Sequence, residues 1–104
     1  MARKYEVEIT ATAERDIQSI FDYIARENPS AAAQWIEEVE RQINSLERFP
    51  ERCPIIPESE ELGQEYRHLI YGNYRTIFRV ESPTVFILRV VHGAQLLDLR
   101  MLEK

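Results

Sequence analysis

Residues 65–92 read EYRHLIYGNYRTIFRVESPTVFILRVVH. Three runs in this stretch, 65–71, 74–80 and 84–92, are rich in β-branched and aromatic residues, which predicts three consecutive strands. Gly72-Asn73 is typical of a two-residue hairpin turn, so Tyr71 is expected opposite Tyr74. These residues therefore predict an antiparallel meander that forms most of one sheet.

The register of this meander assigns its side chains to two faces, because neighbouring residues on a strand point to opposite sides of a sheet. If residues 81–83 form a three-residue turn, Arg89 falls opposite Arg75, with Arg79 close by. Like charges placed opposite each other destabilise a sheet by up to about 1 kcal/mol, so this arrangement indicates a surface that meets an anion. An ordinary solvated face is an equally good interpretation. The expected partner-binding residues on this face are Ile70, Arg75, Ile77, Arg79, Ile87 and Arg89.

Two amphipathic helices are expected before the meander. Residues 5–9 alternate apolar and acidic side chains, as in a half-buried strand, and Thr10 or Thr12 can then cap a helix. Asn28-Pro29 ends this helix and begins a second one, with Asn28 as its N-cap. Apolar residues recur at helical spacing in both segments, and Trp35 is assigned to core packing. A short connection makes the two helices an antiparallel hairpin.

The predicted fold class is α+β, with the order β-α-α-β-β-β and the helical hairpin packed on one face of a mainly antiparallel four-stranded sheet. The covered face is expected to include Phe86, Leu88, Val90 and His92, and the arginine face is expected to stay open. All of residues 1–104 are expected to form a single domain. A short C-terminal tail or helix is predicted from Leu96, Leu97, Leu99, Met101 and Leu102.

The net charge of −5 is unevenly distributed. Residues 1–63 carry seven basic and fourteen acidic residues, whereas residues 64–104 carry six and four, so the sheet half is the expected place for an anionic partner. No apolar run reaches the ~20 residues of a membrane span, and no signal-peptide core follows Met1, so a cytoplasmic protein is expected. Cys53 is the only cysteine, and the acidic residues at 58–61 lack the pattern of a calcium loop. No cofactor or metal is therefore expected.

Several short patterns occur in order along nearly the whole chain: AERDI at 13–17, Asn28-Pro29, Phe49-Pro50, RHL at 67–69, YRTIF at 74–78 and VVHG at 90–93. Taken together, they resemble the RelE/ParE superfamily of type II toxin–antitoxin toxins, which includes proteins labelled plasmid stabilisation. The resemblance implies a bacterial toxin that a cognate antitoxin holds silent.

The resemblance implies one of two activities. RelE-like toxins cut messenger RNA in the ribosomal A site. For this activity, the resemblance implies His92, Arg75 and His68 as the catalytic candidates. ParE-like toxins inhibit DNA gyrase and are not known for a hydrolytic site of their own. No tyrosine follows Tyr74, and Gln95 stands where relatives commonly have arginine, so a non-enzymatic, ParE-like gyrase inhibitor is favoured over a ribosome-dependent endoribonuclease. A weakened toxin that only binds its antitoxin is a third alternative, and a homodimer is a further expectation.

Overall fold

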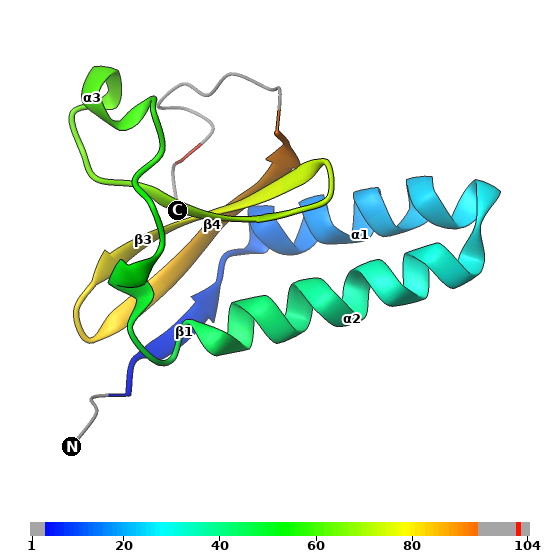
Figure 1. The fold of residues 1–104 in the computed structure, drawn as a ribbon, viewed down its shortest axis with the longest axis horizontal. Helices are drawn as coiled ribbons and strands as arrows, with labels where there is room; N and C mark the ends of the chain where they lie inside the picture. Colours follow the sequence, from blue (N-terminus) through cyan, green and yellow to red (C-terminus); the bar gives the residue numbers. More distant parts are fainter. Residues whose placement is uncertain (1–3, 94–101, 103–104) are drawn as a thin grey trace.

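The computed structural model describes residues 4–93 and 102. Its elements follow the predicted α+β order β-α-α-β-β-β (Figure 1). No helix among these residues has the length and apolar character that crossing a membrane requires. Apart from Leu102, the predicted C-terminal tail or helix lies outside the described residues. The elements are β1 (Glu6–Ile9), α1 (Ala11–Glu27), α2 (Pro29–Ser45), the 3-10 helix η1 (Pro50–Arg52), α3 (Ser59–Leu62), β2 (Arg67–Tyr71), β3 (Tyr74–Glu81) and β4 (Thr84–His92).

Both long helices begin where the sequence predicts. The Thr10 hydroxyl accepts a hydrogen bond from the backbone N–H of Ala13, and the Asn28 side-chain oxygen accepts one from the N–H of Ala31. Each bond satisfies an N–H that has no partner within the helix. Pro29 begins α2, where a missing N–H breaks no hydrogen bond. The helices form the expected antiparallel hairpin (Figure 1).

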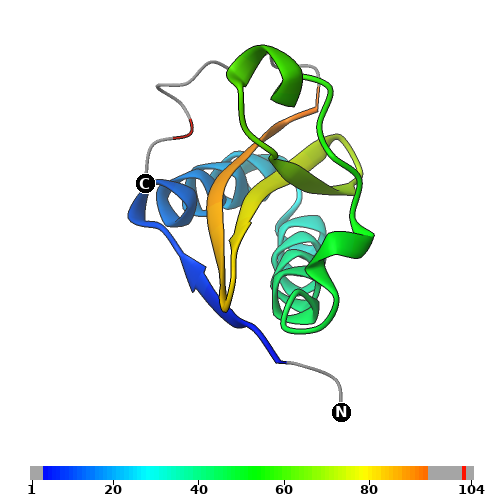
Figure 2. The same ribbon diagram turned by 90° about the vertical axis from the view of Figure 1, so that its left-hand side faces the viewer.

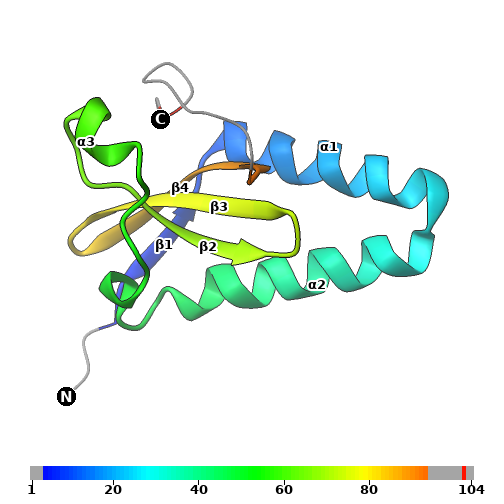
Figure 3. The ribbon, with the colours of Figure 1, turned by 45° about the horizontal axis from the view of Figure 1, so that its top comes forward.

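The sheet is mixed, with the strand order β1-β4-β3-β2. β1 pairs with β4 in parallel, whereas β4 with β3 and β3 with β2 are antiparallel. Tyr71 lies opposite Tyr74, which confirms the predicted register of the first hairpin. Gly72 in the turn has a φ of 58°, a conformation that glycine adopts without strain. The tip of this hairpin lies beside α2 (Figure 3). There the Tyr74 and Trp35 rings make an edge-to-face contact at a centroid distance of 5.7 Å.

The predicted register of the second hairpin is wrong at its turn. Glu81 pairs with Thr84, so the turn is Ser82-Pro83 and is one residue shorter than expected. A shift of one residue exchanges the faces of a strand. As a result Ile87 lies opposite Phe78 on the helix-covered face, where Phe86 and Leu88 were expected.

A β-bulge between Ile77 and Phe78 then shifts the register again. Bulges add an unpaired residue to one strand. Past the bulge, Arg89 lies opposite Ile77, and Arg75 lies opposite Val91. The predicted Arg75–Arg89 pairing is therefore wrong, and no like-charge repulsion across the ladder has to be explained.

Both faces of the sheet are covered, which corrects the expectation of one open face. α1 and α2 lie on one side, and the loop that carries α3 lies on the other (Figure 2). The connection between α2 and β2, which contains Pro50, Pro54 and Pro57, thus forms a second cover for the sheet. The larger core, under the helices, includes Ala13, Trp35, Val39, Ile43, Leu46, Cys53, Phe78, Val85, Ile87 and Val90. The smaller core, under the loop, consists of Ile56, Tyr66, Ile77, Leu88, Val91 and Leu102.

Candidate functional site

Arg75 and Arg79 each lie beside a carboxylate. Arg75 is only 5% exposed, and its two terminal nitrogens donate to the two oxygens of Glu58 at 3.1 and 2.5 Å. Arg79 Nε lies 3.4 Å from an oxygen of Glu81, and both of these side chains are about one-third exposed. The first pair is bidentate and largely removed from water, whereas the second is a surface contact. The charge of Arg75 is therefore already compensated within the chain.

Arg89 belongs to a clamp between α1 and β4. Its Nε and one terminal nitrogen donate to the two oxygens of Asp16 at 2.6 and 3.0 Å, and Asp16 also accepts from the backbone N–H of Val90 at 3.0 Å. β1 pairs with β4 only as far as Ile87. Asp16 thus accepts a hydrogen bond from one N–H of β4 just beyond the residues that pair with β1, and Arg89 orients its carboxylate.

The six predicted partner-binding residues do not form one exposed surface. Ile77 and Ile87 are fully buried in the smaller and the larger core respectively, whereas Ile70 on β2 is 60% exposed. Burial of Ile77 and Ile87 excludes their direct contact with a partner in this conformation. Sequence reasoning missed the carboxylates that pair with the arginines, because nothing in their spacing links Asp16 or Glu58 to the strands.

One hollow of about 400 Å³ brings together the three predicted catalytic candidates, His68, Arg75 and His92. It lies at the end of the β2–β3 hairpin and is also lined by Tyr74, whose ring makes an edge-to-face contact with the His92 ring at a centroid distance of 5.8 Å. His68 pairs with Ile77 and His92 pairs with Tyr74, so the two histidines extend from opposite faces of the sheet at its end. We call this feature the histidine hollow.

Beside the histidine hollow, Arg75 and Glu58 form an ion pair. Hydrogen bonds from Arg75 lower the pKa of Glu58 below its usual value, against a smaller opposing effect of burial. Burial lowers the pKa of His68, and the charge of Arg75 lowers it further. The Nδ1 atom of His68 is buried and has no hydrogen-bond partner among the described residues. At neutral pH, His68 is thus uncharged and contributes no cation toward a phosphate.

In the described part of the chain, no group of three or more histidine, cysteine or acidic residues is placed to hold a metal ion. Cys53 is buried in the larger core, and burial raises the pKa of its thiol. A raised pKa disfavours the thiolate, which is the form that binds metals and attacks substrates.

The profile of the ParE toxin family, from the type II toxin–antitoxin system parDE, matches residues 7–97. The chain belongs to this family and is a toxin of a type II toxin–antitoxin system. No curated protein sequence matches it significantly.

Two solved structures are similar in fold. A chain of the chromosomal ParDE toxin–antitoxin system from P. aeruginosa superposes with a TM-score of 0.70 at 21% identity, covering 88% of this chain and 98% of that one. A chain of the toxin–antitoxin complex RelBE2 from Mycobacterium tuberculosis superposes with a TM-score of 0.56 at 30% identity, covering 86% of this chain and 98% of that one.

Proposed function

We propose that this toxin is a ParE-like inhibitor of DNA gyrase that a cognate antitoxin neutralises. The observation that carries the proposal is the internal pairing of the sheet arginines. Arg75, Arg79 and Arg89 all lie within ion-pair distance of carboxylates of the same chain. Cutting RNA requires cations that stabilise the charge developing on the scissile phosphate. Arginines that already hold carboxylates at short range are poorly prepared for this role.

The net charge and the lack of groups for proton transfer also support a ParE-like rather than a RelE-like function. The chain carries a net charge of −5, and a surface of that sign is repelled by ribosomal RNA. His68 is kept neutral by burial, and the tyrosine that RelE-like toxins use near their C-terminus has no counterpart after Tyr74. Loss of a positioned proton donor typically lowers a rate about 10²- to 10⁴-fold. Inhibition by binding a protein target needs no such group.

A RelE-like, ribosome-dependent endoribonuclease is the second candidate. The observation in its favour is the histidine hollow, which gathers His68, Arg75 and His92 around one space. The similarity to a RelBE2 chain points in the same direction. His92, which is exposed at the rim, is the residue on which this activity would depend.

Expression of the toxin without an antitoxin tests the proposal in cells. We expect the incorporation of labelled thymidine to fall first, while methionine incorporation continues, because gyrase inhibition stops replication before it stops translation. The endoribonuclease reading predicts the reverse order and cuts in messenger RNA at the ribosomal A site. If those cuts occur and His92→Ala abolishes them while Tyr23→Ala, a change at an exposed position on α1, does not, the gyrase proposal is wrong.

A further inference from the structure

Phe49, in the turn between α2 and η1, is exposed and has a strained backbone. Its φ and ψ are 48° and 54°, in the left-handed region that a residue with a Cβ rarely adopts. The ring is 66% exposed, so packing within the chain does not compensate for this strain. Strained conformations are retained most often at functional sites. The conformation of Phe49 therefore indicates a contact outside its own chain.

Two arginines accompany Phe49 in this turn. The Arg52 guanidinium donates to the carbonyl oxygens of Arg48 and Phe49 at 2.6 and 3.0 Å, which fixes the turn in place. Both arginines are exposed, and among the described residues neither forms an ion pair with a carboxylate, unlike the three arginines of the sheet. The turn thus presents an aromatic ring together with two uncompensated positive charges. We call Arg48, Phe49 and Arg52 the Phe49 knob.

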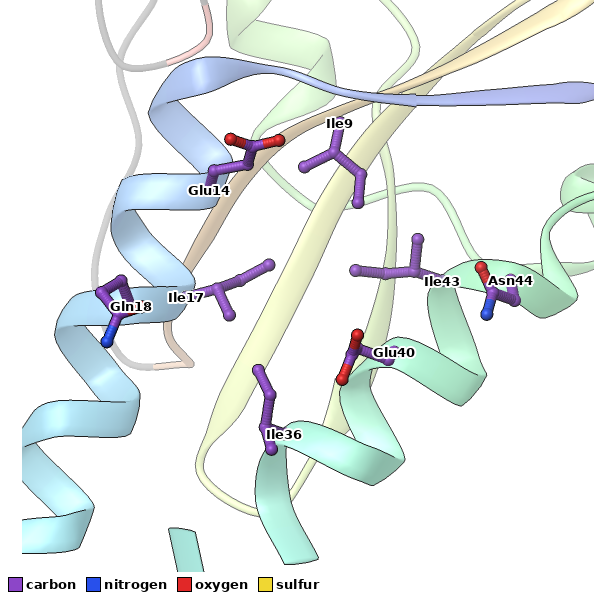
Figure 4. Close-up of a pocket in the computed structure, with 8 residues that line it drawn as sticks. All are labelled: Ile9, Glu14, Ile17, Gln18, Ile36, Glu40, Ile43 and Asn44. Carbon is purple, nitrogen blue, oxygen red and sulfur yellow. The ribbon is translucent and has the colours of Figure 1, made fainter. Parts of the chain in front are cut away.

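An apolar groove lies between α1 and α2. It has a volume of about 230 Å³, which is below the range of about 300–1,000 Å³ that suits drug-sized ligands, so a single large side chain fits it better. Four isoleucines from β1 and from both helices point toward one another and line it, Ile9, Ile17, Ile36 and Ile43 (Figure 4). We call this feature the isoleucine groove.

Two carboxylates flank the isoleucine groove, Glu14 on α1 and Glu40 on α2 (Figure 4). Both residues are exposed, and neither forms an ion pair with another residue of the described chain. The groove is therefore an apolar slot between two negative charges, whereas the Phe49 knob is an apolar ring with two positive charges. Interfaces join surfaces that are complementary in shape and charge. The complement of the groove is thus present on the same chain, which favours a second copy as the occupant.

A two-fold dimer satisfies both contacts at once. Asn44 lines the groove and precedes Phe49 by only five residues, so the groove and the knob lie near the same end of α2. In an isologous dimer the knob of each copy enters the groove of the other, and the assembly closes. Contact between two knobs or between two grooves would instead bring like charges together. Because each copy carries a net charge of −5, we expect the dimer to be reversible.

We propose that this toxin forms a homodimer in which Phe49 of each copy inserts into the isoleucine groove of the other copy. Arg48 and Arg52 then lie beside Glu14 and Glu40 of the other copy. The proposal concerns the toxin alone and does not depend on its target.

Sedimentation of the full-length toxin over a series of concentrations tests the knob. We expect dimers, and we expect Phe49→Asn to raise their dissociation constant about 100-fold. Burial of the exposed part of one phenylalanine is worth about tenfold, and the dimer has two such contacts. Asparagine tolerates the left-handed conformation, so the variant keeps its fold, which circular dichroism checks. The matched control is Tyr23→Asn on α1, where the tyrosine is 65% exposed, and it leaves the dimer unchanged.

Charge reversal tests the groove. Glu14→Arg with Glu40→Arg is expected to weaken the dimer, because the arginines of the knob then meet positive charges. The control Glu60→Arg with Glu61→Arg on α3 changes the net charge equally and does not weaken the dimer. General repulsion between acidic copies predicts the opposite for the groove variant, since its net charge is closer to zero.

Mixing the two variants is the sharpest test. Phe49→Asn retains an intact groove, and Glu14→Arg with Glu40→Arg retains an intact knob, so the mixture restores one of the two contacts. We expect the mixture to form dimers at concentrations at which each variant alone is monomeric. A wild-type toxin that stays monomeric, a mixture that associates no better than its components, or equal losses in the control variants would each overturn the proposal. No gyrase is present in these measurements, so their failure is distinguishable from failure of the proposed function.

Discussion

Glu58→Gln tests how far the Glu58–Arg75 pair stabilises the fold. The two side chains are only 13% and 6% exposed. Removing one partner of a buried pair costs about 3–5 kcal/mol, because the other charge remains buried without compensation. Glutamine retains one acceptor oxygen for Arg75, so we expect the lower end of this range, about 3 kcal/mol. For a chain of this size, that loss lowers the melting temperature by on the order of 10–20 °C.

Urea denaturation followed by circular dichroism measures this loss, since urea does not screen ion pairs. The matched control is Glu81→Gln, which removes the partner of Arg79 at the surface and is expected to cost less than about 1 kcal/mol. The double variant Glu58→Leu with Arg75→Met removes both charges and should recover much of the stability. If Glu58→Gln costs no more than Glu81→Gln, the pair is not a buried ion pair in solution and the reasoning fails.

Three further predictions follow from the same contacts. Asp16→Asn weakens the clamp on Arg89 and on the N–H of Val90. We expect the free energy of unfolding, measured by urea denaturation, to fall by about 1–3 kcal/mol and the amide of Val90 to exchange faster. An unchanged exchange rate would count against the clamp. Stability should fall as the pH drops below 7. His68 has a lowered pKa in the folded chain, so the unfolded chain takes up this proton first, near pH 6.5. Below about pH 4.3 the stabilising charge of Glu58 is lost as well, as the pH falls through its lowered folded pKa. Glu58→Gln should flatten the acidic part of this profile, and an identical slope would contradict the assignment. The Cys53 thiol should react with a thiol reagent far more slowly in the native protein than in urea, because it is buried and its pKa is raised; equal rates would exclude that burial.

Features set by neighbouring residues were predictable from the sequence. Gly72-Asn73 determines a tight turn, so the pairing of Tyr71 with Tyr74 was predicted correctly. The N-caps of α1 and α2 depend on bonds between residues three apart, and Thr10 and Asn28 were identified for that reason. Periodicity likewise assigned Trp35 to the core, which is confirmed.

Features that depend on distant contacts were not predictable. The shorter turn at Ser82-Pro83 and the bulge beside Ile77 each shift the register by one residue, and neither has a strong local signal. The acidic residue Glu58 was visible in the loop sequence, but its pairing with Arg75 arises only when that loop folds across the sheet. The loop that covers the second face of the sheet was not predicted for the same reason, because a sequence pattern does not show where a proline-rich connection will pack.

The central claim is that the toxin acts on gyrase and not on messenger RNA. It is tested most directly by adding purified toxin to purified DNA gyrase, relaxed plasmid and ATP, with a parallel reaction of ribosomes translating a defined messenger RNA. The account predicts loss of supercoiling at toxin amounts comparable to gyrase and an intact messenger RNA. Full supercoiling together with cleavage of the messenger RNA in the ribosomal A site would contradict it.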